Sequence, residues 1–276
     1  SALLFFLMNA ALFAQQKETP YIDSLKASLL NKEQADSNLA NTYNRLAEAY
    51  RYIDSDKNRE YALKAIKSSR TPLYPHGLAM GYNLLAQSYE NQGLYGEAIV
   101  YFDSSLYVSR AANDSSQQAK VLLNIANVYN ATADYGTSAE YIMKSMEIQE
   151  ALNDTFGIAV CRLTLGNVQY GQSNYKSAAV NYITALELNR RSNNNKVFEA
   201  STLGNIGAIM VEQDRYDSAL YFFRQAEVIF RQMNANAKVA STMNNVGSCL
   251  FHLGKMDSAL HYLWTAKSMN EALQRP

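Results

Sequence analysis

The chain has 276 residues, of which 48% are hydrophobic, and its 25 basic and 25 acidic residues leave no formal net charge. The phosphates of nucleic acid require a basic surface, so this balance argues against a nucleic-acid partner for this region. The apolar content can support a long core, which is distributed along the chain when the fold is an array of repeats.

The N-terminal residues 1–14 are apolar except for Ser1 and Asn9, and the polar residues 15–17 follow them. This pattern is typical of the apolar part and cleavage region of a secretory signal, and the run is shorter than the about 20 residues that span a membrane. We therefore expect a truncated signal peptide and an exported protein, periplasmic or membrane-anchored with this region outside the cytoplasm. A buried N-terminal helix is the alternative.

The rest of the chain is organised as a lead segment and an array. Residues 15–39 are expected to form a linker and a short amphipathic helix around Tyr21 to Leu30, which can cap the array. One motif then recurs every 39 to 41 residues, which is typical of a repeat protein. Its leading apolar residues are Leu46, Leu85, Ile125, Leu165, Ile206 and Val246. The array in 40–276 is predicted to contain the repeats 40–78, 79–118, 119–158, 159–199, 200–239 and 240–276.

Each copy of the motif combines small and bulky residues at fixed spacing. In the second copy the small residues are Ala86 and Ala98, Gly93 marks a tight turn, and Phe102 is bulky. Two helices approach closely only where the facing side chains are small. The motif therefore predicts an all-α fold, a right-handed superhelical solenoid of antiparallel helix pairs. The small first-helix residues are Ala47, Ala86, Ala126, Gly166, Gly207 and Gly247, and the residues expected to wedge against the next unit are Phe102, Ile142, Tyr182, Phe223 and Leu263.

These recurring positions resemble the tetratricopeptide repeat (TPR) family across about residues 40 to 276. The unit of that family has 34 residues, so the present copies are longer. The apolar stripe from Phe222 to Met233 predicts a long second helix, and we expect most of the surplus length there. Asparagine and aspartate clusters between copies are typical of turns and caps, and they lie at 113–114, 153–154, 193–195 and 234–236.

The sequence contains no constellation of residues that indicates catalysis, a metal site or a cofactor. His76, His252 and His261 share no metal-ligand spacing with the two cysteines. Cys161 and Cys249 lie two repeats apart, roughly 20 Å in a stacked array. That separation exceeds the reach of a disulfide, so both are expected to be small buried hydrophobes. We expect no enzyme activity in this region and no cofactor.

The remaining candidate is a binding surface. The resemblance implies that first helices line the concave side of the array and that polar residues just before the leading apolar residue face the groove. An amide can donate to and accept from an extended peptide backbone, and asparagine is a poor helix former, so its recurrence there needs a reason. The competing interpretation is that it decorates a solvated helix face. The predicted peptide-binding residues are Asn83, Asn124, Asn127, Asn167, Asn205, Asn244 and Asn245, with Asn44 in the first copy as a register mate and Tyr52 and Tyr170 as further groove candidates.

The apolar start, the lead helix and the long copies together resemble the N-terminal sensing region of membrane-anchored signalling regulators from Bacteroidetes-type bacteria. In those proteins such an array precedes a membrane helix and a histidine kinase or DNA-binding effector. The resemblance implies a non-catalytic scaffold that binds a protein or peptide and meets the membrane only through a segment downstream of residue 276. Two alternatives stay open: a free-standing periplasmic scaffold or assembly factor, and a cytosolic peptide-responsive regulator.

Overall fold

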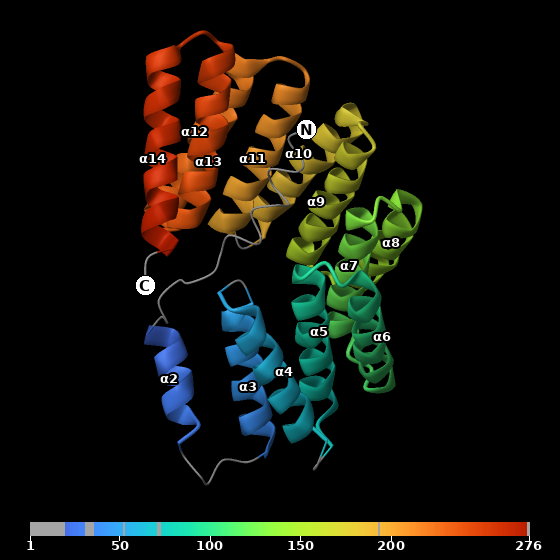
Figure 1. Ribbon diagram of the computed structural model, residues 1–276. Coiled ribbons are helices and arrows are strands. Elements are labelled where there is room, and N and C mark those ends of the chain that lie inside the picture. The colour runs from blue at the N-terminus through green and yellow to red at the C-terminus, as the bar shows by residue number, and fades with distance from the viewer. Residues whose placement is uncertain (1–19, 31–35, 52, 71–72, 193, 275–276) are drawn as a thin grey trace. The chain divides into compact units, whose positions relative to one another are not determined.

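The computed structural model describes residues 20–30, 36–51, 53–70, 73–192 and 194–274 (Figure 1). Within these ranges the chain forms α-helices and no strand. None of the described helices is both long and apolar enough to cross a membrane. The predicted signal peptide and Tyr52 lie outside the described residues.

The described helices follow one another as a lead helix and six antiparallel pairs, which confirms the expected all-α fold of paired helices (Figure 1). Every first helix contacts the second helix of its own pair. The lead helix is α2 (Pro20–Ser28), and the pairs are α3 (Asp36–Tyr50) with α4 (Ser55–Ser68), α5 (Pro75–Asn91) with α6 (Tyr95–Ala111), α7 (Ser115–Ala131) with α8 (Tyr135–Ala151), α9 (Thr155–Gly171) with α10 (Tyr175–Arg191), α11 (Lys196–Glu212) with α12 (Tyr216–Gln232), and α13 (Asn236–His252) with α14 (Met256–Gln274).

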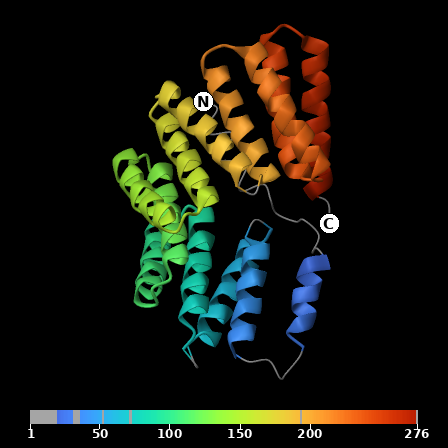
Figure 2. The ribbon, with the colours of Figure 1, turned by 180° about the vertical axis from the view of Figure 1, so that it is seen from behind.

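The described residues divide into two compact units, one ending at Asn153 and one beginning at Asp154. We call them the N-terminal unit, α2 to α8, and the C-terminal unit, α9 to α14. In the N-terminal unit, α2 lies beside α3 in both views (Figures 1 and 2), with Ile22 and Leu25 packed in one apolar cluster with Leu46 and Tyr50.

The surplus length of the repeats is shared between both helices, so the expectation that the second helix carries most of it is wrong. Each helix from α5 to α13 has 17 residues. Each pair begins four residues before the repeat boundary chosen from the sequence. The boundaries themselves stay a prediction, because a repeat can be cut at any point of its period.

The asparagine and aspartate clusters form turns and caps, as expected. The side chains of Asp114, Asp154 and Asn195 accept hydrogen bonds from backbone N–H groups in the first turns of α7, α9 and α11. The cluster before α13 differs, because the cap position holds Ala235 and has no side-chain bond. Left-handed backbone precedes all four of these helices, with φ between 49° and 55° at Asn113, Asn153, Asn194 and Asn234.

The turns inside the pairs also use left-handed backbone, but glycine occupies only some of them. Gly93 and Gly254 have φ of 74° and 71°. Ala133, Ser173 and Asp214 adopt the same region, with φ of 61°, 59° and 56°. The repeat geometry therefore imposes this conformation even on residues with a Cβ, for which it is unfavourable.

The small residues of the first helices lie against the bulky residues of their own second helices. A Cβ placed on Gly166 would lie 2.5 Å from the ring of Tyr182, and one on Gly207 would lie 2.8 Å from the ring of Phe223. In the N-terminal unit alanine holds this position, and Ala47, Ala86 and Ala126 are fully buried. Close packing of helix pairs at small residues is therefore confirmed, and the small residue changes from alanine to glycine between the two units.

Within each unit, the second helix of one pair packs against the first helix of the next pair. In the N-terminal unit Phe102 of α6 clusters with Val121 and Ile125 of α7. In the C-terminal unit Phe223 of α12 clusters with Val246 and Leu250 of α13. The core is thus distributed along each unit. Cys161 and Cys249 belong to it as small buried residues, as expected.

Candidate functional site

Two of the predicted asparagines form a pair in the N-terminal unit. The Nδ2 of Asn124 on α7 donates a hydrogen bond of 2.8 Å to the Oδ1 of Asn83 on α5. Asn83 is 8% exposed, and Asn124 is half-buried. The bond joins two neighbouring first helices, and we call the side of each unit on which its asparagine pair lies its first-helix surface.

An equivalent pair occurs in the C-terminal unit. The Nδ2 of Asn205 on α11 donates to the Oδ1 of Asn167 on α9 at 3.1 Å. The same oxygen accepts a bond of 2.9 Å from the hydroxyl of Tyr182, the residue whose ring packs on Gly166. Burial raises the pKa of Tyr182, so its hydroxyl stays a proton donor at neutral pH. Both units therefore link successive first helices through side-chain amides.

The other predicted asparagines are not brought together in this way. Asn127 on α7 is exposed, and Asn244 and Asn245 on α13 are half-buried. Asn44, the register mate of Asn83 and Asn244, is completely buried and donates a bond of 2.9 Å to the backbone oxygen of Gly77. Asn44 therefore ties α3 to the start of α5, and its expected place in a groove is wrong.

A cluster of charged and amide groups at the ends of α3 and α5 was missed in the sequence. The Nη1 of Arg51 donates a bond of 3.0 Å to the Oε1 of Gln87, and the Nδ2 of Asn91 donates to the backbone oxygen of Arg51 at 3.0 Å. Burial raises the pKa of the Glu90 carboxyl to about 7, although the positive charge of Arg51 opposes this. The repeat register could have identified Gln87 as a candidate, because it holds in its repeat the position of Asn127 and Asn167.

The C-terminal unit holds a carboxylate that two phenols fix in place. The hydroxyls of Tyr170 and Tyr175 donate to the two oxygens of Glu212, at 3.0 and 3.2 Å. The side chain of Tyr170 is 8% exposed, and burial together with Glu212 raises its pKa. Tyr170 therefore contributes to packing and orients Glu212, which is itself exposed at the end of α11.

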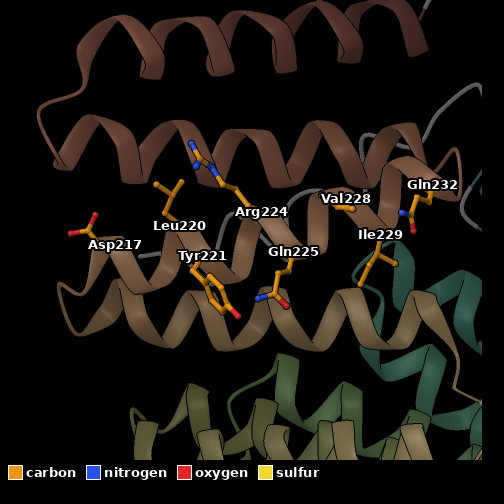
Figure 3. A pocket seen from close by; sticks show the side chains of 8 residues that line it. All are labelled: Asp217, Leu220, Tyr221, Arg224, Gln225, Val228, Ile229 and Gln232. Atoms are coloured by element: carbon orange, nitrogen blue, oxygen red, sulfur yellow. The ribbon is translucent and has the colours of Figure 1, made fainter.

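Two concave regions of the described surface lie away from the asparagine pairs. One, of about 610 Å³, is lined in the described part of the chain by residues of α12 alone, among them Tyr221, Arg224 and Val228 (Figure 3). Another, of about 490 Å³, lies between α2 and α3, where the Nε of Arg45 donates to the hydroxyl of Tyr21 at 3.0 Å. No group of three or more His, Cys, Asp and Glu side chains with the geometry to hold a metal ion occurs among the described residues.

Stacked helix pairs that contact only their neighbours place the chain in the class of all-α repeat scaffolds, whose extended surfaces bind other proteins. The model of the tetratricopeptide repeat family matches residues 77–151, 117–191 and 157–232, which together make up more than half of the chain. The chain belongs to the tetratricopeptide repeat family. Folds of this family are typically non-catalytic. No curated protein matches the chain.

Solved structures share this fold at low sequence identity. The apo form of RapI is 18% identical with a TM-score of 0.68, and the match covers 92% of each chain. A Rap protein complexed with competence and sporulation factor is 15% identical with a TM-score of 0.72, over 98% of this chain and 76% of that one. Aspartyl phosphate phosphatase F from Bacillus subtilis is 14% identical with a TM-score of 0.67, over 90% and 64% of the two chains. These likenesses concern the fold.

Proposed function

We propose that the first-helix surface of each unit binds an extended polypeptide segment and that the chain catalyses no reaction. The observation that carries the proposal is the repeated amide pair, Asn83 with Asn124 and Asn167 with Asn205. The pairs hold the amide groups in fixed orientations, so little side-chain entropy is lost when a ligand binds.

Each pair keeps hydrogen-bonding capacity after its internal bond is made. An amide has two N–H donors and an oxygen that accepts two bonds. Within the described residues, the Nδ2 of Asn83 and the Oδ1 of Asn124 make no other bond, and the same holds for the Nδ2 of Asn167 and the Oδ1 of Asn205. A donor and an acceptor side by side match the alternating C=O and N–H groups of an extended backbone. Recognition of this kind depends little on the ligand's side chains.

The remaining asparagines extend the polar surface beyond the pairs. Asn127 is exposed, and Asn244 and Asn245 are half-buried without a hydrogen-bond partner in the described part of the chain. A Rap protein of similar fold is complexed with competence and sporulation factor, which supports a binding role for such a scaffold.

The experiment selects ligands first and then removes the amides. Peptides enriched on the purified chain from a random displayed library are synthesised with acetylated and amidated ends, and their affinities are measured by fluorescence anisotropy. Changing Asn124, Asn205 and Asn245 together to Ala should weaken binding by about 10-fold or more, because each lost bond to the ligand contributes about 0.5–1.5 kcal/mol. The melting temperature reports whether the variant is folded.

A matched control uses the same substitution away from the surface. Asn236→Ala changes an exposed residue at the start of α13, and we expect it to leave peptide affinity unchanged. If the triple variant and the wild-type chain bind the peptides with equal affinity, the amide pairs are not part of the binding site. Failure to enrich any peptide would refute the proposed function itself.

We also propose that this scaffold is the extracytoplasmic sensing part of a membrane-anchored signalling protein, a histidine kinase or a transcriptional regulator. The apolar residues 1–14 and the resemblance to Bacteroidetes-type regulators support this placement. Protease treatment of spheroplasts from cells that express the full gene product tests it. We expect the protease to digest the repeats, and we expect the undigested protein to be recovered in the membrane fraction. Recovery in the soluble periplasmic fraction would favour a free scaffold or assembly factor, and protection from protease would favour a cytosolic regulator.

A further inference from the structure

A carboxylate of the C-terminal unit lies on the same helix face as an asparagine pair. The bond between Asn167 and Asn205 links α9 to α11, and the bond from Tyr170 to Glu212 links the same two helices a second time. Asn205 and Glu212 are seven residues apart, which is about two turns of helix, so they share one face of α11 at a separation of about 10 Å along its axis. A polypeptide held at the asparagine pair therefore passes within reach of the Glu212 carboxylate.

The carboxylate is held in one orientation and remains accessible. The hydroxyls of Tyr170 and Tyr175 donate to different oxygens of Glu212, at 3.0 and 3.2 Å. A carboxylate can accept about four hydrogen bonds, so these two leave room for further donors. Glu212 is itself exposed. Because the phenols fix the side chain, little rotamer entropy is lost when a ligand binds to it.

Packing of the phenols does not require a carboxylate at this position. Tyrosine also begins the second helices of three other pairs, at Tyr95, Tyr135 and Tyr216. In the first helices that follow these three, the position of Glu212 holds Ala131, Gly171 and His252. The acidic residue after α10 therefore has a role for its charge beyond the packing of the repeat.

The surroundings of Glu212 favour a positive charge. Among the described residues of the C-terminal unit, the ion pairs do not include Glu212, and their acidic members are Glu199, Glu227 and Glu271. Glu212 is the last residue of α11, Tyr170 lies in the last turn of α9, and neither last turn holds a basic residue. The carbonyl groups at helix C-termini carry partial negative charge, so a carboxylate is unfavourable there until a cation binds beside it.

We propose that Glu212 binds a positively charged group of the polypeptide that the C-terminal unit holds. This inference rests on the proposed function and adds a charge that the bound segment must carry. The group is the side chain of a lysine or arginine, or an N-terminal ammonium within about three residues of the backbone held at Asn205, since an extended chain rises about 3.3 Å per residue. Hydrogen bonds between charged groups are roughly twice as strong as neutral ones, so Glu212 adds selectivity to a surface that otherwise recognises backbone.

The first experiment selects the same random displayed peptide library on the wild-type chain and on Glu212→Gln in parallel. We expect the wild-type chain to enrich peptides that contain lysine or arginine or that require a free N-terminus, and we expect the variant to lose this preference. Glu187→Gln is the matched control. It removes the same charge from an exposed residue of the second helix α10 and should select the same peptides as the wild-type chain.

The second experiment measures the coupling between Glu212 and the charge of the ligand. Enriched peptides are synthesised with a free or an acetylated N-terminus, and with each lysine or arginine replaced by uncharged norleucine or citrulline. Removing the group that Glu212 binds should weaken binding to the wild-type chain by about fivefold or more and should leave binding to Glu212→Gln unchanged. The replacement that has this effect identifies the group as a side chain or the N-terminus. A purely structural role of Glu212 would instead weaken the binding of every peptide equally.

The outcomes separate this inference from the proposed function. If the wild-type chain enriches peptides with no excess of positive charge and no need for a free N-terminus, the role of Glu212 is refuted and peptide binding stands. The same holds if removing the charge weakens binding to the wild-type chain and to Glu212→Gln by the same factor. If the wild-type chain enriches no peptide, both proposals are refuted.

Discussion

The packing of helix pairs is tested most directly at Gly207, where α11 meets α12. A Cβ at this position would lie 2.8, 2.9 and 3.0 Å from three ring atoms of Phe223, whereas relaxed carbon contacts are about 3.5–4.0 Å. The ring is 2% exposed and packed with Val246 and Leu250, so it cannot move into solvent. Adding a side chain therefore displaces the ring or separates the helices.

The expected cost of Gly207→Leu follows from these contacts. Overpacking a close-packed core costs about 1–3 kcal/mol, and more when several atoms are added. The higher helix propensity of leucine offsets about 1 kcal/mol of this cost. We expect the free energy of unfolding to fall by about 1–3 kcal/mol, and the melting temperature to fall by about 2–4 °C for each kcal/mol.

Circular dichroism during thermal and urea denaturation measures the effect. Gly96→Leu is the matched control, because a Cβ at this glycine near the start of α6 has no neighbour within 4 Å. A second variant combines Gly207→Ala with Phe223→Ile and so copies the natural combination of Ala126 and Ile142; it should be more stable than Gly207→Ala alone. The reasoning would be falsified if Gly207→Leu melted at the same temperature as the wild-type chain.

Two further predictions concern a carboxyl group and a turn. Burial raises the pKa of Glu90 from 4.5 to about 7, so the folded chain keeps a proton that the unfolded chain has released between these pH values. The free energy of unfolding should therefore fall by on the order of 2 kcal/mol as pH rises through this window. Urea titrations at several pH values measure this fall, which should be absent from Glu90→Gln. The control Glu97→Gln changes an exposed glutamate and should show the same fall as the wild-type chain. Ala133 has a φ of 61°, in the region that Gly93 occupies in the preceding pair, so Ala133→Gly should raise the free energy of unfolding by about 0.5–1 kcal/mol. Ala112→Gly, at a φ of −89°, should lower it, and the same sign for both changes would contradict the account of the turn.

The register of the helix pairs could be predicted from the sequence because close packing requires small and bulky residues at the same positions of every repeat. Ala86 and Phe102 recur in phase since each pair meets the same steric demand. Helix length was predicted less well. Buried residues of α11 lie on most sides of the helix, so no stripe marks its extent, whereas α12 is buried mainly on one side and its stripe is visible. The visible stripe of α12 is the reason why the surplus length was assigned to the second helix alone.

The candidate site was predicted as a set of residues and not as a set of contacts. Which amide pairs with which depends on how neighbouring first helices cross, and the partners Asn83 and Asn124 are 41 residues apart, whereas Asn167 and Asn205 are 38 apart. Asn44 holds the repeat position of Asn83 but donates to the backbone oxygen of Gly77 at the start of α5. Equal spacing in a sequence therefore does not ensure equal surroundings in the fold.

The change from alanine to glycine between the two units limits how the repeats can be exchanged. Glycine lowers the intrinsic stability of a helix by about 1 kcal/mol relative to alanine, so the helices around Gly166 and Gly207 depend more on the aromatic rings seated on their bare backbone. A first helix transplanted from the N-terminal unit carries alanine at this position, and its methyl group would clash with the ring of Tyr182 or Phe223. Recombination within this chain is thus restricted to whole pairs, with each small residue inherited together with the ring that it accommodates.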